Sequence, residues 1–366
     1  MLKKRKKIFG AFVILFFLAF ILLKSSFLPF LFQLVFDRGV SLNQVNGKVN
    51  ILLLGIGGPG HDGPDLTDTM IFASIDQSKD KITLVSIPRD LWVPDLNNKI
   101  NTAYAIGENK KRGLGLVLAK SVVSKILNQP VEYGFRLDFS GFEQAVDLVG
   151  GLDVNVTNTL DDYQYPIDGK ENDSCGHSNT EIASLSAQIA SGSASELDAF
   201  PCRYIHIHFD KGLNHMDGKQ ALEFVRSRHA VGSEGSDFAR SARQEKVIKA
   251  FKDKILSPTT LFNPVKLLSL YTTIKANVDT DIKPTEMDDF IRLGQNLRGA
   301  KIETAVIDYG DAATKRPGLL TNPQPSEKYK YEWVLIPRIG NGNFQEIQGF
   351  VDCELKVGKC TTSPLP

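Results

Sequence analysis

Short apolar runs separated by amphipathic stretches make up most of this chain. The runs at residues 49–56, 70–75 and 82–87 predict buried strands, because each is short and bounded by glycine, proline or charged residues. Further strands are predicted at residues 131–137, 152–156 and 203–209, and helices at 112–127, 140–149 (with Ser140 as N-cap), 217–228 and 237–256. Strands that alternate with helices predict an α/β fold, with a central mixed sheet and helices on both faces.

Two regions depart from this alternation. Residues 158–201 are polar and rich in serine, which predicts a surface insertion. Residues 258–366 contain a helix-rich stretch, a loop rich in proline and lysine at 314–331 and a last predicted strand at 333–336. We therefore expect a domain at 49–257, and a C-terminal extension that packs on it or follows it.

The N-terminus is predicted to be a membrane anchor. Residues 3–7 are all basic, and the apolar run at 8–23 is slightly shorter than the ~20 residues that cross a bilayer. Lys24 can snorkel, and a second apolar stretch follows it. We find no cleavage site of the signal-peptide kind, and a buried soluble helix would not normally begin with so many basic residues. The positive-inside rule then predicts a single-pass protein of the cell membrane, with a cytoplasmic tail at 1–7, a signal anchor and juxtamembrane stretch at 8–36, and an external linker at 37–48.

Composition and cysteine usage are consistent with an external globular protein. A net charge of +1 and 42% hydrophobic residues do not indicate a nucleic-acid-binding protein. Four cysteines allow three pairings, and an oxidising compartment favours the two local ones, Cys175–Cys202 and Cys353–Cys360. No Cys/His spacing indicates a zinc site. His206 and His208 share one face of a predicted strand and are interpreted as structural.

Candidate chemistry begins at Asp68 and Arg89. Asp68 precedes the apolar strand at 70–75, Arg89 follows the strand at 82–87, and only a tight turn joins the two strands. A hairpin would bring the two side chains together at one rim of a sheet. A carboxylate can bind a divalent metal ion, and an arginine can form bidentate hydrogen bonds with phosphate oxygens. The two side by side indicate phosphate chemistry. A structural salt bridge is the alternative.

More arginines are expected near this rim. Arg240, Arg243 and Gln244 share one face of the predicted helix 237–256, and that face continues the apolar stripe of Val247 and Phe251. Buried arginines need anions, which internal salt bridges or the phosphates of a ligand could supply.

The preceding helix contributes two further arginines. Arg228 aligns with the apolar face of that helix, whereas Arg226 points away if the helix stays regular. With Arg89, up to five arginines come from three elements. Such a cluster exceeds what one carboxylate requires and matches a diphosphate.

Six landmarks in the right order make residues 49–256 similar to the extracellular domain of the LytR-CpsA-Psr family. They are the segments at 68–70 (DTM), 86–90 (SIPRD), 99–104 (KINTAY), 149–154 (VGGLDV) and 213–229 (ending in RSRH), and the group Asp237, Phe238, Arg240, Arg243 and Gln244. The resemblance implies transfer of a glycopolymer from a polyprenyl-diphosphate carrier to peptidoglycan, with Mg²⁺ as cofactor.

The resemblance also implies the roles of individual residues. Asp68, Arg89 and Asp90 are the expected catalytic residues, and either aspartate could accept the proton of the acceptor hydroxyl. Arg89, Arg226, Arg228, Arg240, Arg243 and Gln244 are expected to bind the diphosphate, above an apolar pocket floor for the polyprenyl tail. The resemblance implies Asp68 as a metal ligand, and we add Asp62 as a second expected ligand from its place in the nearby glycine-rich loop.

This chain departs from the family pattern at two positions. Gly57 stands where the family usually has an aspartate that shares the metal with the residue matching Asp68. Leu66 stands where an arginine is common. We expect Asp62, or Asp65 in the same loop, to supply the missing carboxylate. The departure at Gly57 motivates one alternative, a non-catalytic lipid- or polymer-binding regulator. Two others stay open: a pyrophosphatase that uses the same site, and a sugar-binding adhesion protein.

Overall fold

The computed structural model describes residues 41–61, 63–255, 257–261, 263–297, 299–311, 316–358 and 360. Among these residues, no helix has both the length and the apolar character that a membrane span requires. The predicted tail at 1–7 and the predicted anchor at 8–36 lie outside the described residues.

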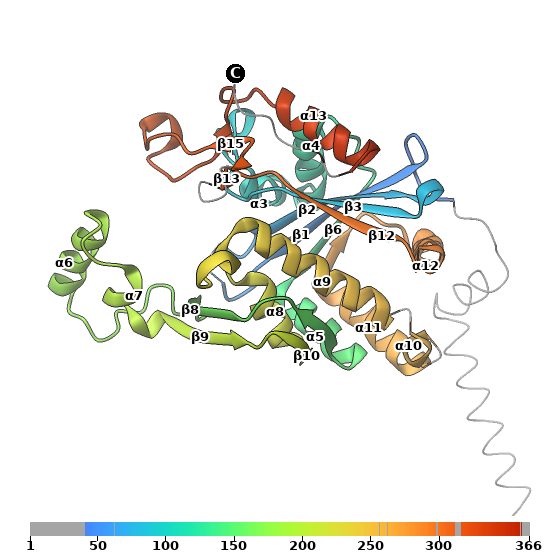
Figure 1. Ribbon diagram of the computed structural model, residues 1–366, viewed down its shortest axis with the longest axis horizontal. Coiled ribbons are helices and arrows are strands. Elements are labelled where there is room, and N and C mark those ends of the chain that lie inside the picture. The colour runs from blue at the N-terminus through green and yellow to red at the C-terminus, as the bar shows by residue number, and fades with distance from the viewer. Residues whose placement is uncertain are drawn as a thin grey trace, which may run out of the picture.

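A six-stranded mixed sheet forms the centre of the fold (Figure 1). Its order is β11-β6-β1-β2-β3-β12, where β1 pairs with β6 and β3 with β12 in parallel, and the other neighbours are antiparallel. The strands are β1 (Lys48–Ile56), β2 (Thr67–Asp76), β3 (Lys81–Ser86), β6 (Tyr133–Asp138), β11 (Val278–Thr280) and β12 (Lys301–Val306). The predicted α/β class with a central mixed sheet is confirmed.

Both edges of this sheet come from the C-terminal part of the chain. β11 extends the sheet beyond β6, and β12 extends it beyond β3. Residues after 257 therefore complete the sheet of the domain predicted at 49–257. The apolar periodicity of single segments does not reveal such long-range pairing.

Helices cover both faces of the sheet (Figure 1). One face presents Leu52, Phe72 and Val85 to α3 (Ala103–Lys110), α4 (Gly115–Leu127) and α13 (Gln345–Lys356). The opposite face presents Ile71, Ala73 and Leu84 to α9 (Asp237–Ile255), and α12 (Met287–Asn296) covers its edge. Successive side chains of a strand point to opposite faces, so these apolar strands are buried on both sides.

A second core lies below α9 in Figure 1. It joins α5 (Phe139–Val149), α8 (Gly218–Arg226), α9 and α11 (Pro264–Asn277), with α10 (Pro258–Leu261) beside them, to two ribbons. The ribbons are β7–β10 (Leu152–Val156 with Gly212–Met216) and β8–β9 (Leu160–Pro166 with Tyr204–Phe209). The region predicted as an insertion at 158–201 thus begins with a strand, and its projecting part holds α6 (Asn179–Ala190) and α7 (Glu196–Ala199).

Both predicted disulfides are present. Cys175–Cys202 closes the projecting part, and Cys353–Cys360 ties α13 to the residues after it. Short strand pairs complete the structure: β4–β5 (Trp92–Val93 with Asn98–Lys99), β13–β14 (Gly310–Asp311 with Arg316–Pro317) and β15–β16 (Leu320–Thr321 with Ile336–Pro337).

Two local predictions need correction, and one helix was missed. The side chain of Asp138, rather than Ser140, caps α5, because its carboxylate accepts a hydrogen bond from the Gly141 amide at 2.7 Å. The strand predicted at 333–336 is reduced to a bridge between Leu335 and Leu91 beside the short β16. The final helix α13 was not predicted.

Candidate functional site

Asp68 and Arg89 meet at one rim of the central sheet. β2 and β3 form the predicted hairpin, with Ile75 opposite Ile82, so the start of β2 lies near the end of β3. The Nη1 of Arg89 donates a hydrogen bond to Oδ1 of Asp68. This contact confirms the meeting that was predicted from the two strands.

A pocket of about 250 Å³ opens beside this pair. Its lining comes from the starts of β2 and β9, from β8 and α9, from the residues after β3, and from the end of α8 with the turn after it. These residues are Asp68, Thr69, Arg89, Asp162, Gln164, Tyr165, Pro166, Tyr204, Val225, Arg226, Arg228, His229, Arg240 and Gln244. Five of the six residues predicted to bind a diphosphate line it. Tyr165, Pro166 and Val225 supply apolar surface beside the arginines.

Arg228 places a partly buried positive charge at this pocket. Among the described residues its guanidinium forms no ion pair, and its Nη2 donates to the backbone oxygen of Asp68 at 3.1 Å. Burial, together with the positive charges of Arg240 and Arg89, lowers the pKa of Arg228 to about 9. Asp68 and Asp90 offset this effect only in part, so the pocket favours a further anion.

Arg226 forms another part of the wall, but its charge is already compensated. Its guanidinium forms two hydrogen bonds with the carboxylate of Asp168, at 3.0 and 3.1 Å, and stacks 4.1 Å from the ring centre of Phe139. This bidentate geometry fixes the side chain. Arg226 therefore shapes the pocket, whereas Arg228 supplies the uncompensated charge.

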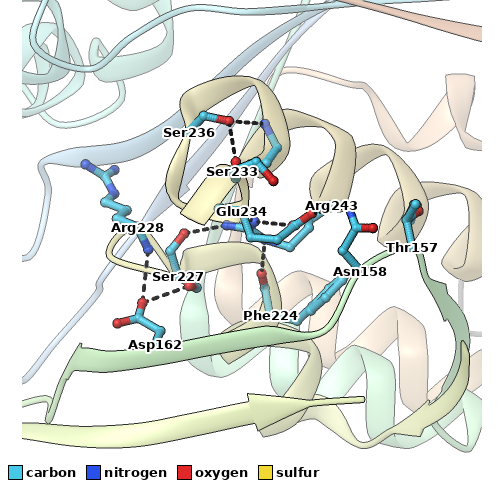
Figure 2. Close-up of polar contacts among 12 residues, drawn as sticks. Thr157, Asn158, Asp162, Phe224, Ser227, Arg228, Ser233, Glu234, Ser236 and Arg243 are labelled. Atoms are coloured by element: carbon cyan, nitrogen blue, oxygen red, sulfur yellow. Dashed lines mark hydrogen bonds and ion pairs between the residues drawn. The ribbon is translucent and has the colours of Figure 1, made fainter. Parts of the chain in front are cut away.

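Contrary to prediction, Arg243 does not line the pocket. Figure 2 shows its contacts with Phe224, Ser227 and Glu234. Its side chain is only 2% exposed and donates to the backbone oxygens of Phe224 (2.9 Å), Ser227 (2.7 Å) and Glu234 (2.7 Å). It also forms an ion pair with the Glu234 carboxylate at 3.2 Å. Arg243 thus fastens the end of α8 to α9, while the Arg228 side chain points away from this network.

Asp162 is a site residue that the sequence did not reveal. Its Oδ2 accepts hydrogen bonds from the Ser227 hydroxyl (2.7 Å) and from the amides of Arg228 (3.3 Å) and His229 (3.2 Å). It lies on β8, inside the segment that we expected to be an insertion. One signal was present: the strand predicted at 203–209 needed a partner.

Asp90, a predicted catalytic residue, does not line the pocket. Its carboxylate lies 3.5 Å from Nε of Arg89 and 3.3 Å from Nζ of Lys99. Lys99 in turn lies 3.0 Å from the carboxylate of Glu332. Asp90 therefore contacts the guanidinium of Arg89 from outside the pocket, which suits a residue that orients Arg89.

Of the expected metal ligands, only Asp68 is found at the pocket in the described residues. Asp68 lines the pocket, Asp62 lies outside the described residues and Asp65 is exposed. A Cβ atom at Gly57 would lie 2.7 Å from Cβ of His61, so the loop in this conformation has no room for the aspartate that Gly57 replaces. One carboxylate together with the phosphate oxygens of a substrate fits the usual coordination of Mg²⁺.

Comparison with known proteins identifies the family of this chain. The profile of the LytR_cpsA_psr family matches residues 34–318. A polyisoprenyl-teichoic acid–peptidoglycan teichoic acid transferase TagU of Oceanobacillus iheyensis is 32% identical over 273 residues, which are 72% of this chain and 68% of that protein. A transferase of the same name from Bacillus cereus is 28% identical, over 66% of this chain and 62% of its own length.

Solved structures show the same fold. The crystal structure of B. subtilis TagV has a TM-score of 0.53 and 23% identity, and covers 85% of this chain and 98% of its own. The Lin1025 protein of Listeria innocua has a TM-score of 0.54 and 21% identity, over 85% of this chain and 99% of its own.

We predict that Arg243→Ala destabilises the protein by ~3 kcal/mol or more, because it leaves buried carbonyl groups and the Glu234 carboxylate without their donor. The free energy of unfolding in urea measures this loss. Lys249→Ala, at an exposed position of the same helix, is the matched control. A change as small as that of the control would contradict the structural role of Arg243.

Proposed function

Because this chain belongs to the LytR-CpsA-Psr family, we propose that it transfers a glycopolymer from a polyprenyl-diphosphate carrier to peptidoglycan. The observation that carries this proposal is the partly buried guanidinium of Arg228 beside Arg89 and Arg240 in the pocket at Asp68. A diphosphate would supply the missing negative charge. Relatives named polyisoprenyl-teichoic acid–peptidoglycan teichoic acid transferases support the substrate class.

The proposed reaction is a phosphoryl transfer. A hydroxyl oxygen of the acceptor sugar attacks the phosphorus that carries the glycopolymer, and the bond from that phosphorus to the polyprenyl phosphate breaks. Polyprenyl phosphate leaves, the hydroxyl proton passes to a base, and a phosphodiester remains. The arginines position the diphosphate and compensate the charge on the leaving group. Of the two aspartates considered as the base, Asp68 is the one that lines the pocket.

We propose Mg²⁺ as the cofactor, held by Asp68 and by phosphate oxygens of the substrate. The ion would neutralise charge on the diphosphate. Asp68 fits this role because its carboxylate lies at the pocket beside Arg89. Asp62 is proposed as a further ligand on the basis of its position in the sequence.

The first test uses full-length protein in detergent with a polyprenyl-diphosphate-linked sugar, Mg²⁺ and peptidoglycan fragments. We expect Arg228→Met to lower the release of polyprenyl phosphate by about 100-fold or more, because a charged contact to the diphosphate is lost. Thermal stability should not fall, since the substitution removes repulsion from Arg240 and Arg89.

Arg112→Met, at an exposed position, is the matched control for this experiment. Wild-type turnover by Arg228→Met would contradict the diphosphate site. The acceptor separates the alternatives: a pyrophosphatase releases polyprenyl phosphate equally well without peptidoglycan, and a non-catalytic regulator releases none.

The metal proposal is tested at Asp68. Asp68→Asn should raise the Mg²⁺ concentration for half-maximal turnover by about 10-fold or more, because one ligand is lost. Calorimetric titration of Mg²⁺ in the presence of a short polyprenyl diphosphate gives a second readout. Asp80→Asn, at the exposed turn of the same hairpin, is the control. An unchanged Mg²⁺ dependence in Asp68→Asn would contradict the assignment.

We further propose that the protein spans the cell membrane once, with its N-terminus in the cytoplasm. The basic residues 3–7 and the apolar run at 8–23 support this placement. The full-length protein should remain in the membrane pellet after alkaline extraction, and external protease should degrade the part after the anchor. Release of the intact chain into the alkaline supernatant would contradict the anchor.

A further inference from the structure

Two histidines and an aspartate gather on one face of the β8–β9 ribbon. Asp161 of β8 lies directly opposite His208 of β9, and His206 lies two residues away on the same face. The Nδ1 of His208 and the Nε2 of His206 lie 2.8 and 2.9 Å from the same oxygen, Oδ1 of Asp161. One ligand atom from each residue falls within 4.8 Å of the others. Two imidazole nitrogens therefore converge on one carboxylate oxygen.

Neighbouring side chains hold both imidazoles in place. The second ring nitrogen of His208, Nε2, lies 3.3 Å from the carboxylate of Asp210. Metal-bound histidines usually donate their other N–H to a carboxylate or carbonyl in this way, which fixes the tautomer and the ring orientation. The ring of His206 stacks on Tyr163, with centroids 4.1 Å apart and an interplanar angle of 4°.

We propose that Asp161, His206 and His208 bind a divalent transition-metal ion of the Zn²⁺ class. Two imidazoles and one carboxylate match zinc sites that keep a position open for water. Nitrogen donors do not suit Mg²⁺ or Ca²⁺, which prefer oxygen ligands. The three side chains are 31–44% exposed, so an ion from solution can reach them. This site is separate from the arginine pocket, and the proposal does not depend on the proposed transfer reaction.

The ion would join the two strands of the ribbon next to Asp162, a residue of the arginine pocket. Asp162, the next residue on β8, points the other way and holds the backbone of Arg228 and His229. A metal at Asp161 would thus stabilise the strand from which Asp162 reaches the pocket. Ion binding to the folded state alone raises its stability by mass action.

A similar histidine–aspartate pair on the other ribbon serves as a comparison for this cluster. On the β7–β10 ribbon, His215 also lies opposite an aspartate, Asp153, and contacts it at 2.7 Å. This pair has one imidazole, and Asp153 also contacts Lys254 at 2.9 Å. A single cross-strand His–Asp pair of this kind needs no metal. The second imidazole is what distinguishes the cluster at Asp161.

The test is calorimetric titration of Zn²⁺ into full-length protein that was purified through a tag without histidine and stripped with a chelator. We expect one equivalent to bind, and Co²⁺ at the same site to give a tetrahedral visible spectrum. His206→Ala and His208→Ala should each weaken Zn²⁺ binding by more than the 10-fold expected for Asp210→Asn, because they remove ligands instead of a supporting contact. His215→Ala should bind Zn²⁺ as the wild type does.

Absence of Zn²⁺ binding to the wild-type protein would overturn the proposal. Unchanged affinity in the His206→Ala, His208→Ala double variant would also overturn it, as would an equal loss in His215→Ala. Circular dichroism of each variant checks that the exposed substitutions leave the fold intact. A rise in thermal stability on adding Zn²⁺, present in the wild type and lost in the double variant, would support the cross-link between the strands.

Discussion

Two buried side chains of opposite charge hold the short turn at residues 226–229, and the geometry of the pocket depends on them. The carboxylate of Asp162 accepts hydrogen bonds from the backbone amides of Arg228 and His229. The guanidinium of Arg243 donates hydrogen bonds to the backbone carbonyls of Phe224 and Ser227. Each charge is satisfied largely by backbone groups, so neither is available to a ligand. The turn itself then presents Arg226 and Arg228 to the pocket at fixed positions.

This arrangement divides the arginines into two kinds. Arg243 stabilises the fold, and Arg226 shares its charge with Asp168. Arg228 has no carboxylate partner among the described residues, and its neighbours Arg89 and Arg240 are also positive. Asp68 and Asp90 offset this electrostatic repulsion in part, and a diphosphate would relieve the rest. Such repulsion lowers stability and is retained where a ligand needs it.

Local geometry made part of the site predictable. A hairpin with a short turn places Asp68 near Arg89 whatever the rest of the fold does, and helix periodicity puts Arg240 and Gln244 on the buried face of α9. Periodicity could not separate Arg243 from them, because the destination of a long side chain depends on which carbonyl groups lie nearby. Asp162 was missed since polar composition concealed its strand, and β11 and β12 were missed since their partners are far away in sequence.

The origin of the two edge strands constrains how the chain can fold. β3 and β6 remain unpaired on their outer sides until residues 278–306 have been synthesised, which is late in the chain. Until then the nascent protein exposes two apolar strand edges, which are templates for aggregation. A fragment that ends near residue 257 would keep all the family landmarks and the whole arginine pocket. It would nevertheless have open edges on both sides of its sheet, so we expect it to be poorly soluble.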